Sequence, residues 1–223
     1  MKKLVTAIVL MGLAAFPGAA AARNVDGTWA PADGDVIRFE VLRQGKPFGF
    51  HQVSFGRDAE GRLTARTEVD LKAGLGPVTF FRYRLDATEV WQDGQLVSLK
   101  GEVKDDGNKG SVTARRVGDA LAVKGTVYDG AAPAGILLAS HWNPGQANAT
   151  QLLSTEDGEI IDVSVSERGR ETVMVAGEPV EATRYLMDSD IDVDLWYDDA
   201  GRWVKLSFTA RGQEIEYVLS QSY

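Results

Sequence analysis

The chain has 223 residues, a formal net charge of −8 at neutral pH and no cysteine. The missing thiols exclude a disulfide framework and cysteine chemistry, and they remove the commonest structural zinc ligand. The acidic balance disfavours nucleic acid and anionic lipid head groups as partners.

The first 22 residues have the pattern of a cleavable secretory signal. Lys2 and Lys3 precede an apolar run over residues 4–16, and Ala22 ends a stretch of small residues suited to cleavage. The run is too short to span a bilayer, and no later segment has the roughly 20 apolar residues of a transmembrane helix. We therefore expect residues 1–22 to be removed and residues 23–223 to enter the periplasm as a single, soluble antiparallel β domain without a stable membrane anchor.

Most of the remaining chain alternates between apolar and polar residues, which is the period of a half-buried strand. Turn signals such as Asp93-Gly94 and Arg211-Gly212 separate the alternating runs at short intervals. In residues 62–71, for example, one face is apolar apart from Thr67 and the other is polar throughout. These patterns predict roughly a dozen or more short strands, in two meanders.

Residues 133–153 interrupt the pattern between the two meanders. The stretches AGILLAS and ANATQLL each fit a short helix, with an Asn-Pro-Gly break between them. A sheet of so many strands must close, form two layers or curl around something apolar. The expected fold class is therefore mostly β: a strongly curved sheet or partly open barrel, with this short helical or irregular segment across its concave face.

His51 and His141 are the two histidines of the sequence. His141 lies in a predicted loop beside Ser140, Trp142 and Asn143, and histidine is the usual acid–base group near neutral pH. A hydrolase that pairs His141 with a carboxylate is one interpretation, although the chain lacks a Gly-x-Ser-x-Gly motif and a cysteine nucleophile. The alternative is structural: Trp142 fills the sheet while its neighbours bond loop backbone. We assign no catalytic residue.

Asp188, Asp190, Asp192 and Asp194 occupy alternate positions. On one strand they would share a face, where like charges repel unless water or a cation lies between them. Val193 stands where a calcium-binding loop requires glycine, so the pattern favours a solvated acidic face over a divalent-ion site. We expect neither a metal nor a cofactor.

Large aromatic residues are expected on both faces of the sheet. Phe80 and Phe81 are sequence neighbours, and Trp196 and Trp203 are expected opposite the aliphatic faces of their strands. Such residues either complete a two-layer core or line an apolar concavity that holds a ligand. Under the second interpretation, the candidate ligand-binding residues are His141, Trp142, Asn143, Phe81 and Trp196.

Several phrases of the sequence occur together in a recognisable combination. They are Val41-Leu42-Arg43-x-Gly45-Lys46-Pro47, Thr88-Glu89-Val90-Trp91, Ser140-His141-Trp142-Asn143, Ala182-Thr183-Arg184-Tyr185 and Asp194-Leu195-Trp196-Tyr197-Asp198. With them, residues 35–219 resemble an uncharacterised secreted proteobacterial family of unknown function. The resemblance implies no activity and no functional residues. More remotely, a curved sheet that opens on an apolar groove is similar to periplasmic lipoprotein carriers, an analogy of fold alone.

Three functions remain open on the sequence. We expect a periplasmic binding or carrier module for an apolar or amphipathic ligand, with a lipid or other hydrophobic small molecule as its partner. The alternatives are an envelope structural or protein-interaction domain, whose protein partner is unknown, and a hydrolase that uses His141.

Overall fold

The computed structural model describes residues 29–75 and 78–222, so the predicted signal peptide over residues 1–22 lies outside the described residues. The described chain is built almost entirely from strands because period-two runs alternate with turn residues. The elements are β1 (Val36–Arg43), β2 (Lys46–Arg57), β3 (Leu63–Leu75), β4 (Val78–Gln92), β5 (Gln95–Asp105), β6 (Asn108–Val117), β7 (Ala120–Gly125), β8 (Asp129–Pro133), β9 (Leu137–Leu138), the 3-10 helix η1 (Pro144–Asn148), β10 (Gln151–Leu153), β11 (Ile160–Asp162), β12 (Ser164–Val175), β13 (Glu178–Asp188), β14 (Val193–Asp198), β15 (Trp203–Ala210) and β16 (Gln213–Ser222).

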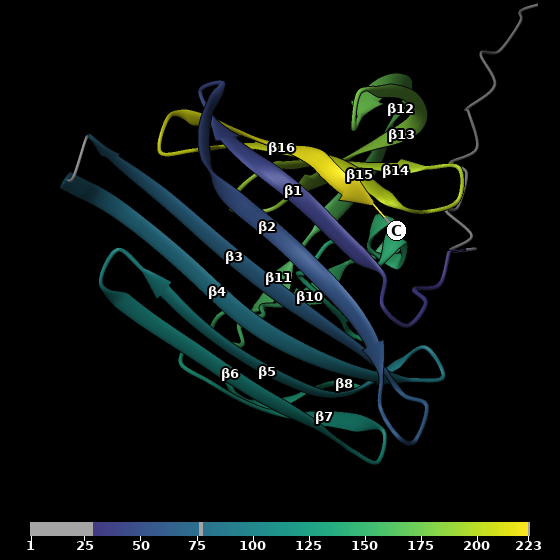
Figure 1. Cartoon of the computed structure of the whole chain (residues 1–223). Coiled ribbons are helices and arrows are strands. Elements are labelled where there is room, and N and C mark those ends of the chain that lie inside the picture. Colours follow the sequence, from purple (N-terminus) through teal and green to yellow (C-terminus); the bar gives the residue numbers. More distant parts are fainter. Residues whose placement is uncertain (1–28, 76–77, 223) are drawn as a thin grey trace, which may run out of the picture.

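Thirteen strands form one curved antiparallel sheet, in the order β12-β13-β14-β15-β16-β1-β2-β3-β4-β5-β6-β7-β8 (Figure 1). Strands β1–β8 and β12–β16 are two meanders, and pairing of β1 with β16 joins them. The sheet does not close, because β8 and β12 stand at its two ends in this order. The expected fold class, a curved and partly open β sheet made of two meanders, is confirmed.

The inner face of the sheet forms the hydrophobic core. In β3 the side chains of Ala65, Thr67, Val69 and Leu71 are buried, as the alternation predicts, and Thr67 replaces one apolar member of the series. Thr67 is only 1% exposed, and its hydroxyl has no hydrogen-bond partner. The period-two pattern therefore identifies the inner face even where a polar residue interrupts it.

Residues 134–163, between the two meanders, lie against this inner face. They contain η1 and a second sheet, β11-β10-β9, which Figure 1 shows within the curve of the large sheet. Their backbone touches strand backbone: a Cβ added to Gly101 would lie 1.9 Å from the Thr155 carbonyl oxygen, and one on Gly125 would lie 2.0 Å from that of Asp157. Strands β9 and β10 and the helix η1 stand where two short helices were expected.

Strand β15 departs from simple alternation at its start. The pairing with β14 shifts by one residue between Trp196 and Tyr197, so that Tyr197 faces Trp203 and Trp196 faces Lys205. This β-bulge turns Trp203 to the inner face, where it is fully buried against Phe39 at 4.2 Å between ring centroids. The prediction that Trp203 lies opposite the inner aliphatic face was therefore wrong, because a bulge reverses the alternation.

The four alternate aspartates do not share a strand face. Asp188 ends β13 and Asp194 lies in β14, while the residues between them form a bend in which the Ser189 hydroxyl donates to the Ile191 carbonyl oxygen. The prediction of one acidic strand face was wrong, because the chain reverses direction within the series. Across residues 29–75 and 78–222, no group of three or more His, Cys, Asp or Glu side chains is placed to hold a metal ion.

The β12–β13 hairpin bends over the outer face of the sheet. Its strand β12 contacts β15 and β16, with which it does not pair. Near the hairpin turn, the Ala176 N–H donates to the Leu219 carbonyl oxygen at 3.2 Å, and Val173 and Val175 are buried. The hairpin thereby gives this part of the sheet a second layer on its outer side.

Candidate functional site

The structure places the five candidate ligand-binding residues in three separate regions. His141, Trp142 and Asn143 lie in the inner segment, within residues 134–163. Phe81 lies near the start of β4, and Trp196 lies in β14. Each region therefore has to be considered by itself.

Trp142 is part of the core. It is 5% exposed, and its ring makes edge-on contacts with Phe55 and Trp91 at centroid distances of 5.3 and 5.8 Å. Its indole N–H donates to the Glu89 carboxylate oxygen Oε2 at 3.0 Å. These contacts fix the inner segment to strands β2 and β4.

Glu89 is a fully buried carboxyl group on the inner face of β4. The same oxygen, Oε2, also accepts a hydrogen bond from the Trp91 indole N–H at 2.8 Å. Burial raises the pKa of Glu89 to about 7, while hydrogen bonds from Ser140, Trp91 and Trp142 act in the opposite direction. Glu89 thus titrates near neutral pH in the middle of the core.

His141 packs against Trp203, at 5.8 Å between ring centroids, and its backbone has a positive φ of 63°. Its Nδ1 atom lies 3.1 Å from Oε1 of Gln146, and its carbonyl oxygen accepts from the Tyr197 hydroxyl at 2.8 Å. Burial lowers the pKa of His141 to about 4, partly offset by the Gln146 hydrogen bond. The ring is therefore neutral at physiological pH, and its hydrogen-bond partner is an amide, whereas the hydrolase interpretation requires a carboxylate.

His51 lies on another side of the same tryptophan, with its ring 5.2 Å from that of Trp203. Its Nε2 atom has no hydrogen-bond partner, and burial, with a smaller contribution from the charge of His141, lowers its pKa to about 3. Asn143 begins η1, and its side-chain oxygen accepts from the Gly145 N–H at 2.9 Å. Asn143 thus caps the start of η1, whereas His51 packs within the core of the sheet.

Phe81 is half-buried on the inner face, near the N-terminal end of β4. Its ring stacks on Phe48 at 5.7 Å, and the Arg211 guanidinium lies 5.8 Å from its centroid. Two residues further along β4, the Tyr83 hydroxyl donates to Glu156 of the inner segment at 2.7 Å. From Trp142 to Glu156, therefore, side chains of the chain itself occupy the concave face that was expected to hold a ligand.

Trp196 differs from the other candidates because it lies on the outer face. Its indole N–H donates to Glu171 in the overlying hairpin. The Arg184 guanidinium and the Lys205 ammonium lie 5.3 and 5.1 Å from its ring, as cation–π contacts. Contacts from β12, β13 and β15 thus hold Trp196 in place beneath the hairpin.

A cleft of about 530 Å³ opens between the hairpin and the outer face of β14–β16. We call it the hairpin cleft. Its apolar lining combines Val173 and Met174 of the hairpin with Trp196, Val204 and Val218 of the sheet. Met174 and Val218 are 59% and 36% exposed, so two of the large exposed apolar residues of the described chain line this cleft. Clefts of 300–1,000 Å³ with an apolar lining are the usual size for small-molecule sites.

The charges of the hairpin cleft are paired within the protein. Arg184 donates two hydrogen bonds of 2.8 Å to Asp194, and the Lys205 ammonium lies 2.8 Å from Glu216. The Asp194 bond favours the charged form of Arg184 and raises its pKa. The cleft is therefore polar at its rim but carries little net charge.

Sequence reasoning found Trp196 but missed the residues around it. Val204 is the extra residue of the bulge, which alternation does not predict. Val173 and Met174 lie on the β12–β13 hairpin, and no local sequence pattern predicts that this hairpin folds over the sheet. One signal was available: Val173, Met174 and Val175 form an apolar run in β12, although this strand stands at the end of the sheet. An apolar run on an end strand indicates that something covers it.

Comparison with known proteins bears on the family and the fold. A sequence model of the family described as "Domain of unknown function (DUF6134)" matches residues 39–220. No match was found among curated proteins. In the described part of the chain, no helix has the length and apolar character needed to cross a membrane.

Two solved structures are similar to this chain. One is a β-barrel-like protein of domain of unknown function DUF1849 from Brucella abortus, with 12% identity, a TM-score of 0.57, and coverage of 85% of this chain and 97% of the other. The second is LprF from Mycobacterium bovis, with 11% identity, a TM-score of 0.35 and coverage of 89% of each chain. The first supports the barrel-like fold, and the second is too distant to bear on it.

Proposed function

The chain belongs to the DUF6134 family, whose description assigns no activity, and we propose that it is an exported binding module for an apolar or amphipathic small molecule. The proposed site is the hairpin cleft. The observation that carries the proposal is a single cleft lined by the exposed residues Met174 and Val218 and by the buried residues Trp196 and Val204. Exposed apolar side chains that gather in one cleft are a common sign of a binding site.

The pairing of the cleft charges defines the chemistry of the ligand. Arg184 and Lys205 already have carboxylate partners, so a free anionic head group would compete with Asp194 and Glu216. A zwitterionic head group can instead interact with both members of a pair. We therefore expect an amphiphile with one acyl chain and a zwitterionic head, such as a lysophosphatidylcholine, to bind better than a fatty acid.

The test is a fluorescence titration of the protein with a fluorescent lysophosphatidylcholine, repeated with a fluorescent fatty acid. The wild-type protein should bind the lysolipid saturably. Met174→Glu places a charge in the cleft and should weaken binding about tenfold or more, since burying an apolar side chain contributes about 1.5–3 kcal/mol. Val117→Glu is the matched control, because Val117 is 63% exposed at the end of β6 and does not line the cleft.

Two results would contradict the proposal. One is the absence of saturable lysolipid binding by folded wild-type protein. The other is equal weakening by Met174→Glu and Val117→Glu, which would indicate binding to apolar surface in general. Denaturant unfolding of both variants, run alongside, separates a loss of binding from a loss of folded protein.

Export rests on the sequence of residues 1–22 alone. N-terminal sequencing of the protein purified from the periplasm should begin at Arg23, as cleavage after Ala22 requires. An intact Met1 on membrane-bound material would exclude a cleaved and released protein.

A further inference from the structure

Strands β3 and β4 extend beyond both of their neighbours. Pairing of β2 with β3 ends at Leu71, and pairing of β5 with β4 ends at Tyr83. Residues 72–75 and 78–82 are thus paired only with one another, as a two-stranded ribbon (Figure 1). We call these residues the β3–β4 ribbon, and its sequence contains no carboxylate.

The ribbon carries an exposed aromatic side chain. Pairing between the two strands shifts by one residue at Ala73 and Gly74, which leaves Phe80 as the extra residue of a bulge. Phe81 packs inward on Phe48, whereas Phe80 is 61% exposed. A bulge re-aims a side chain, and here it leaves a phenylalanine in solvent on a projecting ribbon.

Cations gather on the outer face of the sheet immediately behind the ribbon. Three cross-strand pairings bring like charges together: Lys72 faces Arg82, Arg84 faces Lys104, and Lys104 faces Lys109. Like charges directly opposite each other destabilise a sheet. With Phe80, these five cations form a surface that we call the basic patch.

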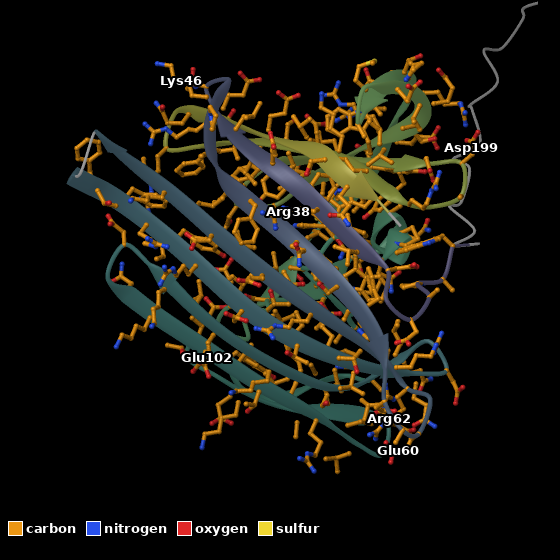
Figure 2. All side chains as sticks on the ribbon, viewed as in Figure 1. Arg38, Lys46, Glu60, Arg62, Glu102 and Asp199 are labelled. Carbon is orange, nitrogen blue, oxygen red and sulfur yellow. The ribbon has the colours of Figure 1, made fainter. Side chains whose placement is uncertain are left out.

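Most of this positive charge is not neutralised within the protein. Asp70 lies within the patch and bonds Arg82 and Arg84, and the exposed Asp106 lies in the turn between Lys104 and Lys109. Lys72, Lys104 and Lys109 have no ion-pair partner among the described residues. Two residues further along the strands, the cross-strand pair is acidic: Asp86 faces Glu102. Figure 2 shows Glu102 on the outer side of β5. The patch is therefore a bounded concentration of cations on a chain whose net charge is −8.

We propose that the basic patch is a peripheral docking surface for an anionic lipid bilayer. Unpaired lysines on one face attract anionic head groups, each contributing about 1 kcal/mol near such a surface. Phe80 supplies the apolar anchor that adds to this attraction at the head-group boundary. An extended nucleic acid fits less well, because stacking along a strand requires a series of exposed aromatic rings and the patch offers one.

The docking surface is separate from the hairpin cleft. Residues of the cleft come from β12–β16, whereas the patch lies on β3–β6. The inference therefore does not depend on the proposed ligand. The overall negative charge still disfavours contact elsewhere, so only this face should approach the lipid.

Vesicle co-sedimentation at low ionic strength tests the proposal. Wild-type protein should bind vesicles that contain phosphatidylglycerol, bind pure phosphatidylcholine vesicles at least tenfold more weakly, and be released by salt. The Lys72→Glu, Lys104→Glu double variant should lose at least about 25-fold in affinity, at about fivefold for each lost cation. Phe80→Ser should lose several-fold. Arg168→Glu, an exposed site on β12 at the far end of the strand order, is the control and should bind like wild type.

Three results would overturn the proposal: no binding of wild type to anionic vesicles, equal binding to both vesicle types, or equal losses in Arg168→Glu and the double variant. Tight binding of single-stranded DNA that is insensitive to Phe80→Ser, without vesicle binding, would also overturn it in favour of a general polyanion surface. Met174→Glu should leave vesicle binding unchanged, which separates a failure of docking from a failure of the proposed cleft.

Discussion

Trp196 and Trp203, on the adjacent strands β14 and β15, lie on opposite faces of the sheet. Trp203 packs inward on Phe39 and His51, while Trp196 lies outward between Arg184 and Lys205. The bulge at the start of β15 produces this arrangement. Because Val204 is one extra residue, Trp203 faces inward, whereas simple alternation would place it on the outer face. The same short hairpin therefore contributes one tryptophan to the core and one to the hairpin cleft.

Replacing the two tryptophans should have different consequences. Trp203→Ala removes a fully buried ring and should lower the free energy of unfolding by roughly 3–5 kcal/mol. Trp196→Ala should act mainly on the hairpin that covers it, because its indole N–H bonds Glu171. Hydrogen exchange at the Ala176 N–H, which is bonded to Leu219 in the closed hairpin, should accelerate more in Trp196→Ala than exchange in β3. Uniform acceleration in both regions would contradict local opening.

The architecture could be predicted from the sequence because its causes are local. Alternation and turn residues specify strands and hairpins one at a time, and β3 buries the residues that its pattern assigns to the inner face. The faces of Trp203 and of the aspartates from Asp188 to Asp194 could not be predicted in this way. A single bulge or bend changes which face the following residues take. Val204 at the bulge is an ordinary strand residue, whereas Ser189 and Asp190 at the bend are common turn residues to which the sequence interpretation gave too little weight.

The sequence left open whether the concave face holds a ligand or is filled by the chain itself, although one signal favoured filling. Gly101, Gly110 and Gly125 stand within or at the end of strands, where glycine usually marks a close approach of another backbone. In the structure each lies against the inner segment at Thr155, Glu156 or Asp157. Glycines at these sheet positions therefore indicated a packed partner more reliably than the aromatic residues indicated a ligand.

Gly101→Ala tests this packing. The added Cβ would lie 1.9 Å from the Thr155 carbonyl oxygen, a contact that requires backbone movement. We expect destabilisation of roughly 1–3 kcal/mol, as for overpacked cores, measured by urea unfolding. Gly56→Ala in β2 is the control, because its nearest atom would be 3.7 Å away. Its stability should be unchanged or slightly raised, and an equal loss in both variants would argue against the inner contact.

His51→Phe should reduce acid sensitivity. Because the folded-state pKa of His51 is lowered to about 3 from 6.5, the unfolded chain binds a proton more readily between these values. Stability associated with His51 is therefore present above about pH 6.5 and is lost as the pH falls towards 3, by up to about 5 kcal/mol. Phenylalanine keeps a ring against Trp203 and removes the unpartnered Nε2 atom. Urea unfolding at pH 7 and pH 4.5 should show a smaller difference in the variant, and an unchanged difference would refute the assignment.

Glu89→Gln should reveal the opposite pH dependence. Burial raises the folded-state pKa of Glu89 to about 7 from 4.5, so the folded protein binds the proton more tightly between these values. The stabilisation is present below about pH 4.5 and is lost as the pH rises through 7, an effect of about 3 kcal/mol. Glutamine keeps an oxygen that can accept from the indoles of Trp91 and Trp142 and cannot ionise.

The stability of the Glu89→Gln variant relative to wild type should therefore increase by about 3 kcal/mol between pH 4.5 and pH 8, measured by urea unfolding at constant ionic strength. Comparing the two proteins at each pH removes the contributions of His51 and His141, which are common to both. Glu40→Gln, at an exposed position of β1, is the control and should follow wild type. A stability difference that stays constant with pH would show that Glu89 does not titrate in this range, and that the two indoles hold it in one protonation state.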